Sequence, residues 1–395
     1  MNSSTAPPQP SAVSQEATSG SSPAARVSTA SIVATMLQAS KQVSDLIFSP
    51  GRTPQVELNG QLRDVNIAGV GKLMPDATRR IATDLIGKND LVAGKLEKEG
   101  STDLSYSLPG MARFRVNIFR QRGSYAIVMR VIPQSIPDFN SLNLPPQLGE
   151  IAELRNGIVL VTGPTGAGKS STLAAILNKI NEEKAYHILT IEDPIEFLHA
   201  HKKSTIHQRE LHSDTPSFAL ALRAALRQAP KVILVGEMRD KETIEIGMEA
   251  AETGHLVFST LHTVDASKTI ERIIGVFPLA DQQAIRTRLA RTFRYIVSQR
   301  LIPKKDGTGR IAAIEILKST MRTREYVEKG ETEGKSLVDA MRDGSTEGMQ
   351  YFDGELERLI RAGILDLETG LSYATNAGNL RLELADLAET SMTNA

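Results

Sequence analysis

A glycine-rich segment near the middle of the chain constrains its fold more than any other feature. It follows an apolar run at 158–161 and precedes a segment in which apolar residues recur at helical spacing. The segment satisfies the phosphate-loop pattern with the residues Gly163, Pro164, Thr165, Gly166, Ala167, Gly168, Lys169 and Ser170. Glycines let backbone N–H groups close around phosphate oxygens, and a helix N-terminus adds positive potential there. We therefore predict a strand, a phosphate-binding loop and a helix in succession.

Two side chains of this loop have specific partners in nucleotide chemistry. Lys169 would bring a positive charge to the β- and γ-phosphates, and Ser170 would offer its hydroxyl to Mg²⁺. Ser171 completes the predicted binding set. The competing interpretation is an ordinary glycine-rich turn, which the flanking strand and helix patterns make the weaker one. ATP and Mg²⁺ are the expected ligands.

Apolar runs and helical patterns continue to alternate after the loop. Three further strands are predicted, at 187–191, 232–235 and 256–258. Asp214, Asp240 and Asp265 are suited to cap the helices that lie between and after them. Such alternation indicates an α/β core, a parallel sheet with helices on both faces, which we assign to residues 147–275. Beyond this core the pattern over 276–395 is mainly helical.

One helix predicted in this last region carries a basic face. Over residues 284–301, apolar side chains share one side, and Arg286, Arg288, Arg291 and Arg294 lie largely opposite. The chain has 46 Lys+Arg against 46 Asp+Glu, so it lacks the basic excess of a broad nucleic-acid surface. We therefore favour a solvated face, or one that meets acidic neighbours, over nucleic-acid binding.

The chain before the phosphate loop divides into three parts. Residues 1–30 are rich in Ser, Ala and Pro and are predicted to be a disordered tail. Residues 31–132 combine a helical pattern, alternating strands and a hairpin turn at Asn59–Gly60, which predicts a small α+β domain. Residues 133–146 contain four prolines and are predicted to be an extended linker.

The composition excludes several kinds of site. The chain has no cysteine, which rules out disulfides, thiolate zinc sites and cysteine nucleophiles. No run approaches the roughly 20 apolar residues of a membrane span, and the N-terminus lacks the pattern of a secretion signal. We therefore expect no direct insertion into a membrane. Aromatic residues make up 4% and tryptophan is absent, which argues further against nucleic acid as a partner.

Polar residues follow the other predicted strands of the core. Glu192 and Asp193 end the second strand, Glu237 ends the third, and Thr260 and His262 end the fourth. The carboxyl ends of parallel strands share one edge of a sheet, so these groups should meet beside the phosphate loop. We assign Glu237 to orienting or deprotonating an attacking water, and Mg²⁺ coordination to Glu192 or Asp193, directly or through bound water. His262 is suited either to sensing the γ-phosphate or to pairing with Glu237.

Three arginines of the first domain are candidates for a further catalytic charge. Arg113 and Arg115 point the same way from one alternating strand, and Arg130 lies at the end of the neighbouring strand. A separate domain can bring an arginine to a transferred phosphate, yet exposed arginines on a small sheet are often only solvated. Both interpretations remain open on the residues alone.

Several motifs, taken in order, resemble those of the secretion ATPase superfamily (GspE/PilT-like), and most closely its type IV pilus retraction ATPases. The match runs over most of the chain. Segment 44–60 looks like the start of the family's PAS-like N-terminal domain, and 112–117 looks like its arginine strand. Residues 191–197 resemble the family's Asp box, 236–240 its Walker B segment and 254–263 its His box.

This resemblance implies a RecA-like P-loop NTPase core behind a PAS-like domain, and a ring-shaped homo-hexamer with nucleotide bound between the two domains. It implies that Arg113, Arg115 and Arg130 contact phosphate. It also implies a cytoplasmic protein, peripheral at the inner membrane, whose partners are a pilus platform protein and a paralogous pilus ATPase. Assembly and type II secretion relatives usually carry a tetracysteine metal element, so the absence of cysteine favours the retraction branch.

Some positions depart from the family pattern. Gly236 stands where an Asp usually precedes the Walker B Glu, and Lys231 stands where the family usually has an acidic residue. The helix that the family associates with retraction is represented only by 321–326. The expected function is a hexameric Mg²⁺-ATP motor for pilus retraction and twitching motility. The alternatives are a related secretion or conjugation ATPase, a RecA-like nucleic-acid motor, and a non-hydrolysing regulatory subunit.

Overall fold

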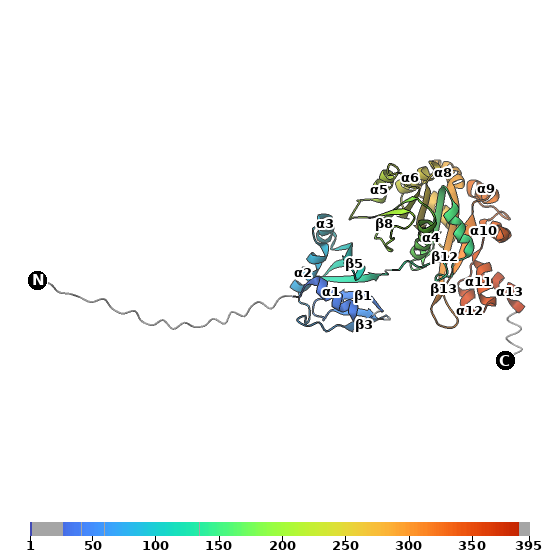
Figure 1. Ribbon diagram of the computed structural model, residues 1–395. Coiled ribbons are helices and arrows are strands. Elements are labelled where there is room, and N and C mark those ends of the chain that lie inside the picture. The colour runs from blue at the N-terminus through green and yellow to red at the C-terminus, as the bar shows by residue number, and fades with distance from the viewer. Residues whose placement is uncertain (2–26, 41, 59, 134, 387–395) are drawn as a thin grey trace, which may run out of the picture.

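The computed structural model of the protein describes residue 1 and residues 27–386, except 41, 59 and 134. In this part of the chain there are two sheets, one in each of two domains (Figure 1). The tail predicted at 1–30 falls largely outside the described residues. Its last residues do not, because Ser28 caps the first helix and that helix begins at Thr29. The N-terminal domain therefore starts slightly earlier than predicted.

The N-terminal domain is an antiparallel sheet in the order β3-β2-β1-β6-β5-β4, packed with three helices. Its strands are β1 (Val43–Phe48), β2 (Gln55–Leu58), β3 (Gln61–Asp64), β4 (Ser101–Leu108), β5 (Ala112–Gln121) and β6 (Ser124–Ile132). Its helices are α1 (Thr29–Gln38), α2 (Pro75–Ile86) and α3 (Asp90–Glu99). Phe114, Val116 and Ile118 of β5 are fully buried in the core of this domain, so the arginines between them face away from it. The predicted α+β domain and the β2–β3 hairpin are present, although Asn59 of the turn lies outside the described residues.

The segment between the domains packs against the second one. Leu144 is buried there, and Phe139 and Leu142 pack onto the same apolar cluster. A 3₁₀ helix, η1 (Pro146–Glu153), follows and buries Leu148 and Ile151. The apolar residues of this proline-containing connection therefore attach it to the second domain, which we call the core domain.

The core domain is built on a sheet in the order β13-β12-β7-β11-β10-β8-β9. Its strands are β7 (Gly157–Thr162), β8 (His187–Glu192), β9 (Thr205–Glu210), β10 (Val232–Glu237), β11 (Leu256–Leu261), β12 (Phe293–Pro303) and β13 (Arg310–Lys318). Neighbouring strands are parallel except for the antiparallel pair β12–β13. Every residue of β7 is buried, as expected for a parallel strand covered on both faces.

Helices cover both faces of this sheet. They are α4 (Lys169–Glu183), α5 (Phe218–Ala225), α6 (Lys241–Glu252), α7 (Ala266–Ile274) and α8 (Leu279–Thr292). Ile158 and Leu160 of β7 join the apolar cluster under α5–α8, and Val159 and Val161 join the cluster under α4 and η1. Because alternate residues of β7 face opposite sides of the sheet, the apolar core of this domain has two layers, one on each face. The predicted α/β architecture is confirmed.

The prediction of a single helix over 284–301 is wrong in its second half. Helix α8 ends at Thr292, and Phe293 begins β12, which pairs with both β7 and β13. The apolar spacing of this stretch suits a helix face as well as a strand, and pairing with β7 together with the β-branched Ile296 and Val297 decides for the strand. The sheet therefore continues to Lys318. The predicted core limit at residue 275, and the mainly helical description of 276–395, are wrong over β12 and β13.

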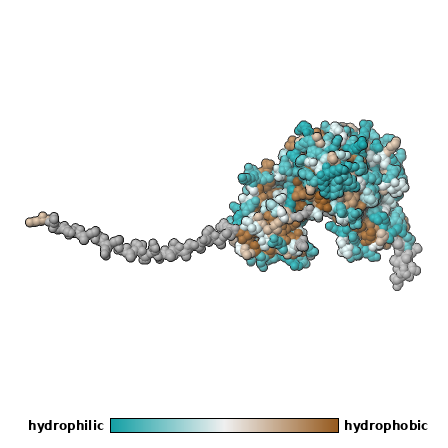
Figure 2. Space-filling view, viewed as in Figure 1, coloured by the Kyte–Doolittle hydropathy of each residue, from teal (hydrophilic) through white to brown (hydrophobic). Residues whose placement is uncertain are grey.

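The remainder of the described chain is helical. Its elements are α9 (Met321–Lys329), α10 (Leu337–Asp343), η2 (Ser345–Glu347), α11 (Phe352–Arg361), α12 (Leu367–Ser372) and α13 (Ala377–Glu383). On the predicted basic face, Arg288 of α8 forms an ion pair with Glu252 of α6 at 2.8 Å, so that face does meet an acidic neighbour. None of the helices in the described part of the chain is long and apolar enough to cross a bilayer. Hydrophilic side chains dominate the face of the core domain seen in Figure 2.

Glu315 on β13 is a buried carboxyl whose ionisation opposes folding. It is 3% exposed, and it accepts a 2.8 Å hydrogen bond from the backbone N–H of Ala266 at the start of α7. Burial raises the pKa of Glu315 from 4.5 to about 7. Between those two pH values the folded protein binds more protons than the unfolded chain, so the free energy of unfolding falls as the pH rises through this window.

The variant Glu315→Gln keeps the hydrogen-bond acceptor and removes the titration. We expect its free energy of unfolding, relative to that of the wild type, to be larger at pH 8 than at pH 5, by up to about 3 kcal/mol. Urea titrations at the two pH values measure this difference. The exposed Glu333, changed to Gln, is the control. A Glu315→Gln difference that is the same at both pH values would contradict the assignment.

Candidate active site

The phosphate loop lies between β7 and α4, and its glycines are required by geometry. Gly163 has a φ of +146°, and a Cβ atom there would lie 2.5 Å from the carbonyl oxygen of Gln299 on β12. Gly168, the residue before α4, has a φ of +89°. Side chains at these positions would strain the backbone or displace β12. The loop leads directly into the N-terminus of α4, where backbone N–H groups attract phosphate.

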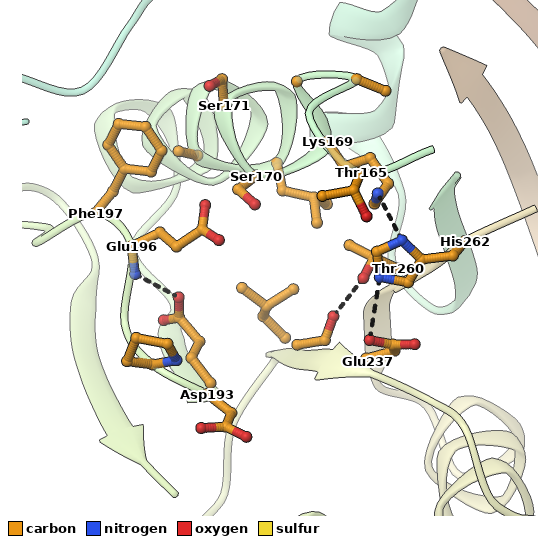
Figure 3. A pocket seen from close by; sticks show the side chains of 18 of the residues that line it. Thr165, Lys169, Ser170, Ser171, Asp193, Glu196, Phe197, Glu237, Thr260 and His262 are labelled. Atoms are coloured by element: carbon orange, nitrogen blue, oxygen red, sulfur yellow. Dashed lines mark hydrogen bonds and ion pairs between the residues drawn. The ribbon is translucent and has the colours of Figure 1, made fainter. Parts of the chain in front are cut away.

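A cavity of about 740 Å³ lies in front of this loop (Figure 3). The ends of β8, β10 and β11 line it and bring together the predicted residues Lys169, Glu192, Glu237, Thr260 and His262. Residues 165–171 of the loop line it as well, whereas Gly163 and Pro164 contribute carbonyl groups behind Lys169. Arg239 and Arg310 also line the cavity, and no sequence pattern singled them out as site residues.

Lys169 is held inside its own loop. Its Nζ donates to the carbonyl oxygens of Gly163 at 2.8 Å and Pro164 at 3.0 Å, and it lies 3.4 Å from Nδ1 of His262. Burial lowers the pKa of Lys169, and the negative charge of Glu237 opposes that shift. A phosphate group in the cavity would offer this ammonium a charged acceptor, which makes a stronger hydrogen bond than a carbonyl does.

Glu237, at the end of β10, faces two nitrogen-bearing side chains. Arg239 donates to its Oε2 at 2.5 Å, and Nε2 of His262 lies 3.4 Å from the same oxygen. His262 therefore stands between Lys169 and Glu237, with one ring nitrogen toward each (Figure 3). This arrangement agrees with the interpretation in which His262 pairs with Glu237. Thr260, opposite Glu237 in the β10–β11 ladder, donates to the carbonyl oxygen of Gly236 at 2.6 Å.

Gly236 departs from the family's Walker B pattern for a steric reason. A Cβ atom there would lie 3.3 Å from the carbonyl oxygen of Ile191 and 3.4 Å from Cα of Glu192. Strand β8 comes so close that a carboxylate side chain at this position would have to push it away. An acidic group for the metal could instead come from the end of β8 or from the segment that follows it.

Two glutamates, one at the end of β8 and one in the segment after it, line the cavity. Glu192 is 8% exposed and accepts hydrogen bonds from the side chains of Thr190 at 2.6 Å and Gln208 at 3.1 Å. Burial raises the pKa of Glu192 to about 7. Glu196 points into the cavity toward Ser170 (Figure 3). Sequence reasoning missed Glu196 because it lies beyond the strand end, after a proline.

This acidic side of the cavity fits Mg²⁺. The ion keeps several waters and takes one or two protein oxygens together with phosphate oxygens. The hydroxyl of Ser170 and the carboxylate of Glu196 face each other, whereas Asp193 points away from the loop (Figure 3). Ser170, with Glu192 or Glu196 directly or through water, could therefore hold the ion beside a nucleotide.

The three arginines predicted to contact phosphate lie in different environments. Arg115 lines the cavity. Arg113 instead forms an ion pair with Glu210 at the end of β9. Arg130 pairs with Asp45 of β1 at 2.9 Å, and 71% of its side chain is exposed. Within the described residues of one chain, the structure thus brings Arg115 to the cavity and holds Arg113 and Arg130 elsewhere.

Comparison with known proteins identifies the family. The family model for type II/IV secretion system proteins matches residues 58–363. The chain belongs to this family. A twitching motility protein of Neisseria gonorrhoeae is 43% identical over 328 residues, which cover 83% of this chain and 86% of that protein. The type IV pilus retraction ATPase PilT of Pseudomonas aeruginosa is 42% identical over 336 residues, which cover 85% of this chain and 95% of that protein.

A solved structure agrees with this family assignment. The crystal structure of the pilus retraction motor PilT with bound ADP matches this chain with a TM-score of 0.79 and 40% identity, over 88% of this chain and 97% of that one. The resemblance inferred from the motifs is thereby confirmed. The family match also spans both domains, since it begins at the end of β2 and ends just beyond α11.

Proposed function

We propose that this protein hydrolyses ATP and uses the energy to retract a type IV pilus, the process behind twitching motility. One observation carries the ATPase assignment: His262 links the phosphate-loop lysine, Lys169, to the strand-end glutamate, Glu237, within a single cavity. Retraction as the work performed is supported by the similarity to a twitching motility protein and to retraction ATPases.

The side chains divide the reaction between binding and proton transfer. Lys169 and the N-terminus of α4 hold the β- and γ-phosphates. Glu237 takes a proton from the water that attacks the γ-phosphorus, the bond from that phosphorus to the bridging oxygen breaks, and ADP leaves with the electron pair. Arg115 and Arg239 bring positive charge to the side of the cavity where negative charge spreads over phosphate oxygens. Mg²⁺, when bound through Ser170 and an acidic neighbour, neutralises phosphate charge.

The proposed assembly is a homo-hexameric ring in the cytoplasm, docked at the inner membrane on a pilus platform protein. A paralogous pilus ATPase is a further proposed partner. Arg130, with 71% of its side chain exposed, is accessible to a neighbouring copy in such a ring. Within one chain it lies outside the cavity, so any contact of Arg130 with nucleotide would be made across a subunit boundary.

The other functions considered have weaker support. A nucleic-acid motor would be expected to have a basic excess, and the positive and negative charges of this chain balance. A subunit that does not hydrolyse ATP would not need the contacts that connect Lys169, His262 and Glu237. A related secretion or conjugation ATPase shares the same cavity, and the retraction ATPases among its relatives favour the pilus instead.

Deletion of the gene tests the retraction role. We expect cells with an excess of surface pili that do not retract and with no twitching, because assembly would proceed without removal of subunits. Pilus counts by electron microscopy and the diameter of twitching zones measure this. Complementation with the wild-type gene should restore both, and complementation with a Lys169→Ala gene should restore neither. Loss of surface pili on deletion would instead indicate an assembly motor.

A further inference from the structure

The carboxylate of Glu210 joins the two domains beside the active site. It lies at the end of β9, and one of its oxygens, Oε2, accepts hydrogen bonds from three groups. Ser105 Oγ on β4 donates at 2.7 Å, the backbone N–H of Ile195 donates at 3.1 Å, and Arg113 on β5 completes an ion pair. Two of these donors belong to the N-terminal domain and one belongs to the core domain.

The two donors of the N-terminal domain are the immediate neighbours of Arg115. Ser105 is the residue directly opposite Arg115 in the β4–β5 ladder. Arg113 precedes Arg115 by one alternation of β5, so both side chains leave the same face of the sheet. Glu210 therefore contacts two neighbours of Arg115, one across the β4–β5 pair and one along β5 itself.

The core-domain side of this contact is part of the cavity wall. In the parallel β8–β9 ladder, Glu210 pairs with Glu192, which lines the cavity. Ile195, whose N–H binds Glu210, stands between the lining residues Pro194 and Glu196. The same carboxylate thus fixes the segment that carries Glu196 and the strand that carries Arg115.

The ion pair is largely shielded from solvent. The side chains of Arg113 and Glu210 are 15% and 7% exposed. Nε of Arg113 is buried with no hydrogen-bond partner among the described residues, and Arg113 does not line the cavity. A guanidinium enclosed in this way serves the domain contact, and breaking such a buried pair leaves an uncompensated charge.

We propose that Glu210 is a positioning residue for the reaction, which docks β5 on the core domain through Arg113 and Ser105 so that Arg115 reaches the nucleotide phosphates. Arg113 is then the docking cation and Arg115 the arginine that touches phosphate. This inference rests on the ATPase function proposed above. It assigns different roles to Arg113 and Arg115, which the sequence pattern does not distinguish.

A double-mutant cycle on the full-length protein tests these separate roles of Arg113 and Arg115. We expect Arg115→Ala to lower kcat about 1,000-fold, as loss of a transition-state cation does. Glu210→Gln and Arg113→Ala should each lower kcat about 100-fold, because a shift of about 1 Å in a catalytic group has that effect. The double variant Glu210→Gln/Arg115→Ala should be no slower than Arg115→Ala alone, because the amide of Gln still accepts the hydrogen bond from the N–H of Ile195 and loses only the ionic contact that positions Arg115. Losses that multiply in the double variant would overturn the proposal.

The readouts separate positioning from general loss of structure. Binding of a fluorescent ADP analogue should stay within about threefold of wild type in Glu210→Gln, because the phosphate loop is untouched. Ser105→Ala removes a hydroxyl that donates to Glu210 and accepts from Arg113, but it removes no charge. It should lower kcat about threefold to tenfold, and it should cause no further loss when combined with Arg115→Ala. This variant keeps the test decisive if Glu210→Gln fails to fold. Glu97→Gln, which breaks the exposed pair with Arg120 on the same strand β5, is the matched control and should leave kcat unchanged.

The domain contact itself can be observed. Because the chain has no cysteine, the exposed residues Lys88 and Glu249, each changed to Cys, accept a donor and acceptor dye without competing labels. We expect Glu210→Gln to broaden the distribution of energy-transfer efficiency between the domains, and Glu97→Gln to leave it unchanged. An unaltered distribution in Glu210→Gln would overturn the docking role. Failure of the ATPase function is distinguishable, since it would appear as a wild type no more active than Lys169→Ala.

Discussion

Lys169→Ala is expected to abolish ATP hydrolysis, lowering kcat/KM about 1,000-fold or more. Its ammonium is the cation enclosed by the phosphate loop, where it is held by two backbone carbonyls and faces His262. Without it the β- and γ-phosphates lose their charge partner, and the loop loses the internal hydrogen bonds that hold its shape. Release of inorganic phosphate measures turnover, and a fluorescent ADP analogue measures binding.

The matched control for this variant is Lys179→Ala. Lys179 is a partly exposed lysine on the same helix α4, paired with Glu183 at 2.5 Å, and it does not line the cavity. Its removal costs a surface ion pair and should leave kcat/KM within about twofold of wild type. If the Lys169→Ala protein retained a tenth of the wild-type kcat/KM, the proposed role of the phosphate loop in hydrolysis would be wrong.

Glu237→Gln is expected to separate binding from hydrolysis. The amide keeps the size of the side chain and can still accept the hydrogen bond from Arg239, but it cannot take a proton from water. We expect ATP affinity within about threefold of wild type and a kcat about 100- to 10,000-fold lower. Equilibrium binding and single-turnover hydrolysis measure the two quantities separately.

Glu242→Gln serves as its control, because Glu242 is exposed on α6 and forms a surface ion pair with Arg223. Its turnover should match that of the wild type. If Glu237→Gln turned over ATP at a near-wild-type rate, the water-activating role would pass to another carboxylate of the cavity. Glu196 and Glu192 would then be the residues to test next.

The parts of the site that could be predicted are those that one local pattern encodes. The phosphate loop is contiguous, so the spacing from Gly163 to Ser170 is enough to place it. The convergence of Glu192, Glu237 and His262 follows from a general property of parallel sheets, which needs only the strand ends to be located.

The parts that could not be predicted depend on partners far away in the chain. The apolar residues of 284–301 do recur at helical spacing, yet β12 forms from Phe293 onward because it pairs with β7. Arg113 and Arg115 are equivalent in the pattern of β5, and only the position of Glu210, brought close by the domain arrangement, distinguishes them. Glu196 is similar, since its direction is set by the turn that follows β8 rather than by a periodic pattern.

Strand β12 has a mechanical consequence for a protein that converts nucleotide chemistry into motion. Its Gln299 lies against Gly163 of the phosphate loop, and the next residue, Arg300, stacks at 3.8 Å over Phe352 of α11. The same Arg300 donates to the carbonyl oxygen of Tyr373 beyond α12. The two contacts are made by adjacent residues of a strand that is paired on both sides. We therefore expect a displacement of the phosphate loop to be passed through β12 to the C-terminal helices.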